Sequence, residues 1–451
     1  MKGFELNAAH LAVTRDALDA AGLARIELCQ QDFFSHDWDV EMRSHEGHVL
    51  VLGNPPWVTN AAVAAVAGTN LPQKQNVYGL RGLAAKTGKA NFDIAEWMLI
   101  RLLQALRGRK ATLAVLCKTA TAQKVLRHAW HQDLRVTSAT LHHIDAGEHF
   151  GAAVEACLLI ARLGEPGPAA AKIYPNLAAK IPTHRFGIAG KGLVADLDAY
   201  ERLRHFEGLS PYQWRSGVKH DCAPVLELQP LDGGLFANKL GEEIPLENKT
   251  LFPLLKGTEL ARRGAIPTRK VLLPQTRLGE DTSTLAISAP LAWQYLDRHR
   301  ARFTARKSSI YTKGAAFAIF GIGDYAFSDW KVAISALHRP PHFFVVGPWE
   351  NQPVMFDDTC YYLPFAVEAE ARVVADILNS AACRSFLETL IFPGAKRAVT
   401  VELLQRLNLD AIARAAGLSK RWDDSRQPDL DDSQLPLVLS DALESVPAQA
   451  V

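Results

Sequence analysis

The stretch that most constrains the fold runs from Val49 to Trp57, where four aliphatic residues precede Gly53-Asn54-Pro55-Pro56-Trp57. A continuous aliphatic run of this length is typical of a strand buried on both faces of a parallel sheet. A glycine and two prolines interrupt such a strand, so it is expected to end at Gly53. Asn54 is therefore predicted at the carboxyl end of the strand, the edge where open α/β sheets bind ligands.

Residues 54–57 carry groups suited to methyl transfer onto an exocyclic amine, whose nitrogen lone pair is conjugated with a ring. The Asn54 side-chain oxygen and the Pro55 carbonyl could accept hydrogen bonds from the two N–H groups of the amine. These bonds would favour tetrahedral geometry at the nitrogen and free its lone pair. The prolines would fix the direction of these acceptors, and Trp57 offers a face for a planar base. The alternative interpretation is a rigid turn after a core strand, with Trp57 simply packed.

The rest of the first 163 residues alternates short strands with amphipathic helices. The pattern predicts strands at 3–7, 26–29, 113–117, 139–144 and 156–161, and helices at 8–21, 92–106 and 120–130. Such alternation is typical of a parallel α/β sheet, here closed by a late hairpin. The segment from 58 to about 88, rich in Ala, Gly, Asn and Gln, is interpreted as a mobile loop over the site.

Length and composition set the class of protein. The chain has 451 residues, 48% of them hydrophobic, which is enough for two domains with full-sized cores. Its six cysteines have no paired spacing, so no metal and no disulfide framework is expected, and the cytoplasm is the default location. The sequence has no signal peptide and no apolar run long enough to span a membrane.

Charge is unevenly distributed, although the net charge is only +2. Residues 256–313 contain 12 Lys and Arg against 4 Asp and Glu, whereas residues 423–451 contain 7 acidic residues and 1 Arg. A local basic block on a nearly neutral protein suits a polyanionic partner. On charge alone, an ordinary solvated helix face is the better interpretation.

Several short motifs follow one another along the first 163 residues. They are Gly3-Phe4-Glu5, Gln31-Asp32-Phe33, Asn54-Pro55-Pro56-Trp57, Phe92-Asp93-Ile94-Ala95 and the run from Thr112 to Lys118. Together they resemble the motifs of adenine-N6 DNA methyltransferases, in the order and spacing of that family. The arrangement, with target recognition after catalysis, resembles the gamma class, which includes the methylases of restriction-modification systems.

The resemblance implies roles for individual residues. Glu5 would bind the ribose hydroxyls of S-adenosylmethionine, Asp32 and Phe33 would contact its adenine, and Phe150 would be a second aromatic against a flipped base. The implied catalytic residues are Asn54, Pro55, Pro56, Trp57 and Phe150, and the implied cofactor-binding residues are Glu5, Asp32, Phe33 and Asn54. Without the motif order, Glu5 and Asp32 are also readable as helix N-caps and Phe150 as a core residue.

The implied fold class is α/β, a Rossmann-like S-adenosylmethionine-dependent methyltransferase fold followed by an α+β target-recognition domain. The family's glycine-rich cofactor loop would lie upstream of Gly3, and no Gly-x-Gly occurs before Asn54. The strand missing with it is the middle strand of the sheet, so its neighbours are expected to have unpaired edges. The fold is therefore predicted to be N-terminally incomplete. Either a separate chain or a longer gene product would carry the loop, and residues 1–451 alone are expected to bind the cofactor weakly or not at all.

The pattern changes after Leu163, where a glycine- and proline-rich run at 164–168 indicates a boundary. The expected organisation is a methyltransferase domain at 1–163, a connecting region at 164–205, a DNA target-recognition domain at 206–420 and an acidic disordered tail at 421–451. Segments 256–260, 325–331, 378–380 and 392–397 resemble target-recognition domains of the same enzymes. Double-stranded DNA is the implied partner, and the candidate phosphate contacts are Lys256, Arg262, Arg263, Arg302, Arg306, Lys307, Tyr311 and Lys313.

Two other functions stay open at this point. The Asn-Pro-Pro core also serves enzymes that methylate a glutamine side chain in proteins, although the long basic second half argues against that substrate. Without its cofactor loop, the chain could instead be a DNA-binding fragment or a specificity partner that performs no catalysis. Retained DNA affinity without cofactor binding would mark this second case.

Overall fold

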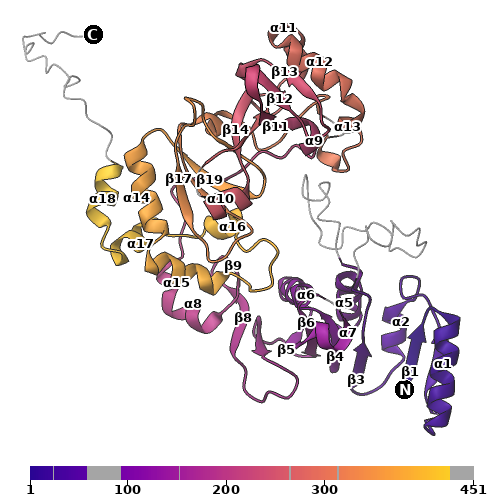
Figure 1. The fold of residues 1–451 in the computed structure, drawn as a ribbon. Coiled ribbons are helices and arrows are strands. Elements are labelled where there is room, and N and C mark those ends of the chain that lie inside the picture. The colour runs from indigo at the N-terminus through magenta and orange to yellow at the C-terminus, as the bar shows by residue number, and fades with distance from the viewer. Residues whose placement is uncertain (24, 58–92, 152, 264–265, 312–313, 427–451) are drawn as a thin grey trace, which may run out of the picture.

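The computed structural model describes residues 1–426 except 24, 58–92, 152, 264–265 and 312–313, so the expected loop at 58–88 lies outside the described residues. The described strands form four sheets. Figure 1 shows the chain leaving the group of strands β1 to β9 for a second group of sheets and helices. In the part of the chain that the structure describes, no helix is long and apolar enough to cross a membrane.

Two short parallel strands begin the chain. β1 (Lys2–Glu5) pairs with β2 (Glu27–Gln30), and α1 (Ala8–Ala20) connects them. The helix begins where the Asn7 side chain accepts a hydrogen bond from the Ala9 N–H at 2.9 Å, and the chain turns back at Gly22, whose φ is +69°. The predicted strand, helix and strand are confirmed here, with β1 already ending at Glu5.

A seven-stranded sheet follows, with the strand order β3-β4-β6-β5-β7-β8-β9. β3 runs parallel to β4, and β6 is antiparallel to both β4 and β5, which confirms the predicted parallel sheet closed by a late hairpin. Its first elements are β3 (Val49–Gly53), α5 (Ile94–Ala105), β4 (Ala111–Lys118), α6 (Thr119–His131), β5 (Val136–Ile144), α7 (Ala146–Phe150) and β6 (Ala156–Leu163).

The core of this first half lies on one face of the sheet. Buried and half-buried residues alternate along β4, which places one set on each face. The buried set, including Leu113 and Val115, packs with residues of α5, α6 and α2 (Trp38–Arg43). Phe4 of β1 packs against the same core, so the two-stranded sheet and the seven-stranded sheet share one helical layer.

Residues 164–205, expected as a connecting region, extend the seven-stranded sheet instead. β7 (Ala170–Tyr174) pairs in parallel with β5, and β8 (His184–Ala189) and β9 (Gly192–Val194) follow in antiparallel order. Gly167 permits this path, because a Cβ there would lie 2.0 Å from the Thr137 carbonyl oxygen of β5. The glycine- and proline-rich run therefore carries the chain along the sheet rather than away from it.

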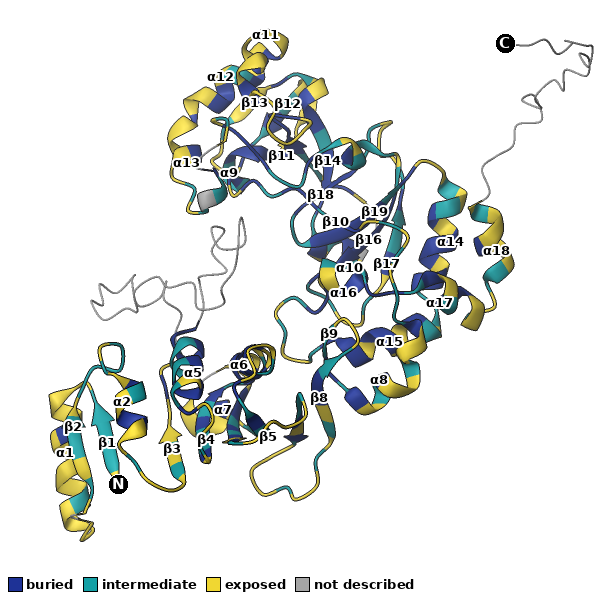
Figure 2. Cartoon of the chain, turned by 180° about the vertical axis from the view of Figure 1, so that it is seen from behind, coloured by how far each residue is buried: buried dark blue, intermediate teal, exposed yellow. Residues whose placement is uncertain are grey.

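The second half contains a six-stranded sheet, in the order β13-β12-β11-β15-β14-β18, and a four-stranded sheet, in the order β10-β19-β16-β17. Both sheets pack in hydrophobic cores that are separate from the core of the seven-stranded sheet. Figure 2 shows their buried strands between helices whose outer faces are exposed. The strands are β10 (Arg215–Ser216), β11 (Glu227–Pro230), β12 (Leu235–Ala237), β13 (Glu243–Pro245), β14 (Leu251–Leu255), β15 (Arg269–Leu272), β16 (Trp330–Ser335), β17 (Phe343–Val346), β18 (Met355–Phe356) and β19 (Cys360–Phe365). The helices up to residue 304 are α8 (Leu197–Leu203), α9 (Ala223–Leu226), α10 (Gly257–Arg263), α11 (Leu285–Ser288), α12 (Pro290–Arg298) and α13 (Arg300–Thr304).

The last five helices complete the core around the four-stranded sheet. They are α14 (Glu368–Leu378), α15 (Ala381–Leu390), α16 (Val401–Leu404), α17 (Leu409–Ala415) and α18 (Ser419–Ser425). Trp422 of α18 is buried in this core, and its Nε1 donates to the Asp410 carboxylate at 2.6 Å. The expectation that a disordered tail begins at residue 421 is therefore wrong for the first residues of that segment, and residues 427–451 lie outside the described residues.

Candidate active site

Four of the predicted site residues follow the carboxyl ends of strands. Glu5 ends β1, Asp32 follows β2, Asn54 follows β3, and Phe150 ends the short helix that follows β5. β1 runs parallel to β2 and β3 to β4, and β5 runs in the same direction as β4 because β6 is antiparallel to both. β1 and β3 point the same way in Figure 1. These residues therefore lie along one edge of the layer of strands, the edge at which ligands bind in open α/β sheets.

In the turn after β3, the Asn54 amide faces solvent and the Trp57 indole is held by a hydrogen bond. Pro55 is buried, whereas Asn54 and Pro56 are exposed and Trp57 is half-buried. The Trp57 Nε1 donates to the Leu116 carbonyl oxygen of β4 at 3.4 Å, which holds the ring over the neighbouring strand. Among the described residues none hydrogen-bonds to the Asn54 side chain, so its oxygen is open to a ligand.

Trp57 and Phe150, the two aromatic residues of the predicted base site, lie against each other. Their ring centroids are 5.4 Å apart and the ring planes are inclined by 73°, an edge-to-face contact. Phe150 remains 47% exposed, which is high for the core residue of the alternative interpretation. A base held between two parallel rings needs about 7 Å, two contact layers of about 3.5 Å, so the rings would have to separate to admit one.

A buried ion pair beside this turn carries no predicted role. Asp93 caps the N-terminus of α5 by accepting from the Ala95 N–H, and its second oxygen accepts from the Lys118 Nζ at 2.7 Å. Lys118 is the last residue of β4, the strand next to β3. The pair fixes the carboxyl end of β4 to the start of α5. Both residues lie in motifs that the resemblance identified, but Phe92 lies outside the described residues.

Glu5 and Asp32 are not the N-caps that the alternative interpretation requires. The caps of α1 and α2 are Asn7 and Asp37, while Glu5 accepts from the Asn7 N–H at 2.8 Å and Asp32 accepts from the Phe34 N–H at 2.9 Å. In each carboxylate only one oxygen is engaged by a described residue. Both side chains are half-buried at the sheet edge and keep an acceptor open toward it.

Phe33 belongs to an aromatic cluster that joins β1 and β2 to the helical layer. Its ring lies 4.6 Å from Trp38 of α2 and 6.1 Å from Trp97 of α5, and its carbonyl accepts from the Trp38 Nε1 at 2.9 Å. Phe34 lies 5.1 Å from Trp97. Phe33 therefore has a packing role in addition to the cofactor contact that the resemblance implies.

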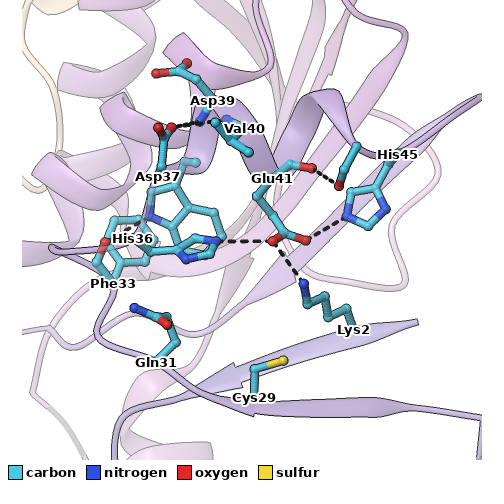
Figure 3. Close-up of polar contacts among 12 residues, drawn as sticks. Lys2, Cys29, Gln31, Phe33, His36, Asp37, Asp39, Val40, Glu41 and His45 are labelled. Carbon is cyan, nitrogen blue, oxygen red and sulfur yellow. Dashed lines mark hydrogen bonds and ion pairs between the residues drawn. The ribbon is translucent and has the colours of Figure 1, made fainter.

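Figure 3 shows the carboxylate that fixes β1 to α2. Glu41 is buried and accepts from the Lys2 Nζ at 3.0 Å, while the Nε2 atoms of His36 and His45 lie 3.2 and 3.0 Å from its oxygens. Burial acts to raise the pKa of Glu41, but the hydrogen bonds from Lys2 and the histidines outweigh it, so the pKa lies below its ordinary value. The β1–β2 pair is thus held by a buried anion as well as by aromatic packing.

The predicted DNA-contact residues divide into two groups. Arg262, Arg302 and Lys307 are exposed. Arg306 is instead half-buried, because its guanidinium donates to the carbonyl oxygens of Phe303, His220 and Ala318 and lies 3.6 Å from the centre of the Tyr311 ring. Tyr311 itself is buried. The side chain of Arg263, in α10, and the whole of Lys313 lie outside the described residues.

Lys256 lies in a buried cluster of charges that the sequence did not indicate. The Glu227 carboxylate, whose side chain is 2% exposed, pairs with Lys239 and Lys256 at 2.6 Å each and with Arg269 at 3.6 Å. A cavity of about 570 Å³ adjoins this cluster and is lined in part by His220, Glu227, Lys256 and Asp357. The ammonium group of Lys256 therefore serves a buried anion and is not a free surface charge.

The chain is similar in sequence to a type II methyltransferase over most of its length. It is 37% identical over 417 residues to the type II methyltransferase M.NspV of Nostoc sp. (strain ATCC 29411 / PCC 7524), and the match covers 91% of this chain and 86% of that protein. No family model matches the chain.

Solved structures give weaker likenesses. The type IIL restriction-modification enzyme MmeI, in complex with DNA, superposes with a TM-score of 0.48 at 13% identity; the superposition covers 90% of this chain, which spans 58% of the length of MmeI. The type IIG restriction endonuclease BpuSI gives a TM-score of 0.28 at 13% identity, covering 89% of this chain and 51% of BpuSI. Because both TM-scores lie below 0.5, the assignment to a family rests on the Nostoc methyltransferase.

Proposed function

The chain belongs to the type II methyltransferases, and from this premise we propose that it transfers a methyl group from S-adenosylmethionine to the N6 amino group of adenine in double-stranded DNA, within a restriction-modification or phage-defence system. The observation that carries the proposal is the turn at residues 54–57. It presents the Asn54 amide at the carboxyl end of β3, beside the contact between Trp57 and Phe150. An amide acceptor next to aromatic faces suits a planar base with an exocyclic amine.

In the proposed mechanism, Asn54 and Pro55 hold the amino group for attack. The target adenine is flipped out of the duplex at a cost of a few kcal/mol and packs against Trp57 and Phe150, which move apart to receive it. The Asn54 side-chain oxygen and the Pro55 carbonyl accept hydrogen bonds from the two N–H groups of the amine. The nitrogen lone pair is thereby freed and directed toward the cofactor side. The acceleration comes from positioning and from a site matched to the charge that moves during transfer.

The residues at the edge of the sheet fit part of the cofactor. S-adenosylmethionine, when bound, supplies an electrophilic methyl group on a sulfonium. Glu5 and Asp32 each keep a carboxylate oxygen free of described partners, which suits the hydroxyl and amino donors of a nucleoside. Phe33 offers an aromatic edge beside Asp32, and Asn54 lies next along the same sheet edge. The Asp93–Lys118 pair would position this turn without contacting the base.

The cofactor site formed by residues 1–451 is incomplete in this proposal. β1 and β3 are hydrogen-bonded in separate sheets, and no described strand lies between them. A further strand with its loop, on a separate chain or on the same polypeptide, would complete the methyltransferase domain at residues 1–163. The observation equally favours a second candidate function, a DNA-binding fragment or specificity partner that lacks catalysis.

The proposed target-recognition domain spans residues 206–420. Its candidate phosphate contacts reduce to Arg262, Arg302 and Lys307 among the described side chains, because Lys256 and Arg306 are engaged inside the fold. Charged side chains of this kind position a protein on the duplex and do not read its sequence.

The test is methylation of mixed-sequence DNA, followed by identification of the methylated nucleoside by mass spectrometry. Assays contain residues 1–451 with S-adenosylmethionine, alone and with the parts of the Nostoc methyltransferase outside the matched span. We expect N6-methyladenine, and we expect Asn54→Ala to reduce the rate at least about 100-fold with DNA affinity nearly unchanged, as loss of a positioning group does. Asn176→Ala, at an exposed asparagine between β7 and β8, is the matched control.

Each other outcome has a defined meaning for the proposal. Methylation of cytosine would reject the adenine assignment, and substantial residual activity of Asn54→Ala would reject its acceptor role. DNA binding without cofactor binding or methylation in either assembly would support the specificity-partner function instead.

A further inference from the structure

The loop between α15 and α16, at residues 392–397, belongs to the second half of the molecule but contacts the first. The ring of Phe392 packs against the core of the seven-stranded sheet, with its centroid 5.8 Å from that of Phe186 in β8. Two residues later, Gly394 lies against the Glu155 carboxylate so closely that a Cβ on Gly394 would overlap it. The loop therefore touches the first half at two points.

Glu155 places the second contact at the edge of the sheet that carries the candidate active site. Its carbonyl oxygen accepts from the N–H of Thr119, the residue after β4, at 3.0 Å. Because β6 is antiparallel to β4 and β5, the start of β6 after Glu155 adjoins the carboxyl ends of both strands. Asn54 and Phe150 lie along the same edge. The loop at 392–397 is thus a part of the second half that reaches the catalytic edge.

Arg339, in the connection between β16 and β17, holds the backbone of this loop. Its guanidinium donates to the carbonyl oxygens of Phe392, Pro393 and Ala395, the last at 3.4 Å. A planar guanidinium with five N–H donors suits such a set of acceptors, whereas a lysine ammonium does not offer the same fixed geometry. The loop therefore has a defined shape although Pro393 and Gly394 are exposed.

Lys396 is the cation that this loop leaves free. The next residue, Arg397, is engaged within the second half, where it donates to the carbonyl oxygen of Asp358 at 2.7 Å and to its carboxylate at 3.0 Å. Lys396 is exposed, and no described residue pairs with its ammonium group. Adjacent Cα atoms lie 3.8 Å apart, so the Cα of Lys396 is within about 7.6 Å of that of Gly394 and hence close to the catalytic edge.

A flipped nucleotide stays attached to its strand, so the phosphates on either side of it pass the edge at which the base enters. A fixed loop with one free ammonium suits a single phosphate contact there, which positions the strand and reads no sequence. We propose that Lys396 contacts a phosphate next to the target nucleotide, and that Arg339 is the positioning residue that holds Lys396 in place. The inference rests on the proposed function and deepens it, because it assigns the contact that holds the strand while the base leaves the stack.

The experiment measures binding of the chain of residues 1–451 to a short duplex in which one adenine lies opposite an abasic residue. Such an adenine leaves the stack at little cost, so the probe needs no knowledge of the recognition sequence. Fluorescence anisotropy is recorded at several salt concentrations. We expect Lys396→Gln to make the slope of log affinity against log salt shallower by about 1, and to lower the affinity about three- to tenfold at about 0.1 M salt. The control Lys420→Gln, at an exposed position in α18, should leave both quantities unchanged.

A second probe tests the place of the contact. It carries neutral methylphosphonate linkages in place of the two phosphates that flank the unpaired adenine. We expect the unaltered chain to bind this probe about three- to tenfold more weakly than the first, whereas Lys396→Gln should bind the two probes within about twofold of each other.

Arg339→Lys tests the positioning role, because it keeps the charge and loses the fixed set of donors. We expect it to weaken binding in the unaltered chain and to have little further effect in combination with Lys396→Gln. Melting temperatures show whether each variant remains folded, and Lys396→Gln, at an exposed position, tests the phosphate contact even if Arg339→Lys does not fold.

The inference fails if Lys396→Gln changes the salt slope no more than Lys420→Gln, or if it loses as much affinity for the methylphosphonate probe as the unaltered chain does. Lys396 would then balance the nearby Glu155 carboxylate and not a phosphate. Additive effects of Arg339→Lys and Lys396→Gln would reject the positioning role. Absence of binding by the unaltered chain would reject this contact together with the DNA partner of the proposed function. A chain that binds both probes as expected and transfers no methyl group would overturn the proposed activity while supporting the contact.

Discussion

The Glu227 carboxylate is the centre of a buried cluster of charges in the second half of the molecule. Its side chain is 2% exposed, and Lys239, Lys256 and Arg269 converge on it from separate elements. We expect Glu227→Gln to reduce the free energy of unfolding by about 2–3 kcal/mol, less than the 3–5 typical of fully buried pairs because the cations are partly exposed. Unfolding in urea would measure this loss. The control is Glu201→Gln, at an exposed ion pair with Arg204, which should reduce the free energy of unfolding by less than about 1 kcal/mol.

The pH dependence of that contribution has a definite sign. Burial acts to raise the pKa of Glu227, but the hydrogen bonds from Lys239 and Lys256 outweigh it, so the folded pKa lies below the ordinary value of 4.5. A lowered folded pKa stabilises the protein above the unfolded pKa and loses that effect as pH falls through the folded value. The difference in stability between the protein and Glu227→Gln should therefore be full above pH 4.5 and shrink below it. A difference that is unchanged at low pH would reject the charge-based explanation.

At the scale of elements, the attachment of the β1–β2 pair to α2 depends on Glu41. Because Lys2, His36 and His45 all contact this buried carboxylate, Glu41→Ala leaves a cation without its partner and removes three contacts. We expect a loss of about 1–3 kcal/mol, confined to local opening of β1 and β2. Hydrogen exchange should accelerate in β1 and β2 and not in β4. Glu46→Ala, at an exposed position near the end of α2, serves as the control, and equal acceleration in both variants would contradict the role.

Hydrophobic periodicity and the positions of glycine and proline were sufficient to predict most elements of the first half, but not the short helices α2 and α7. The aliphatic run at Val49, the helical spacing before Leu106 and the glycine after α1 each reflect local rules, and β3, α5 and α1 follow them. The role of residues 164–205 could not be predicted in this way, because β7 depends on pairing with β5 and on the close approach at Gly167. Helix α18 was missed because acidic composition concealed the buried Trp422.

The parts of the candidate site formed by residues adjacent in the sequence could be predicted. The turn at 54–57 lies where the pattern places it, after β3. The contact between Trp57 and Phe150 joins this turn to the helix after β5, and β4 and β6 lie between these two strands in the sheet, so tertiary packing decides it. The Asp93–Lys118 pair and the internal role of Arg306 depend on partners far along the chain, which no local pattern contains. Whether a cation faces solvent or a carbonyl is decided by tertiary packing.

On the scale of the whole molecule, the proposed DNA surface depends on exposed cations that lie far from the catalytic turn in sequence. Arg302, in α13, and Lys307, just after this helix, remain exposed, while the neighbouring Arg306 donates to the Phe303 carbonyl oxygen of α13. Each phosphate that a cation neutralises releases counterions, so the salt dependence of binding counts such contacts. The salt dependence of the affinity therefore distinguishes a surface whose cations contact DNA phosphates from a basic surface that makes no such contacts.

We expect the double variant Arg302→Gln/Lys307→Gln to weaken binding to short duplexes of every sequence. The slope of log affinity against log salt should become shallower by about 2, one for each lost contact. Fluorescence anisotropy at several salt concentrations would measure both. The matched control is Arg414→Gln/Lys420→Gln, which removes the same charge from exposed positions in α17 and α18, far from α13 in Figure 1. If the two double variants change the slope equally, net charge alone explains binding, and the region around α13 has no special contact with DNA.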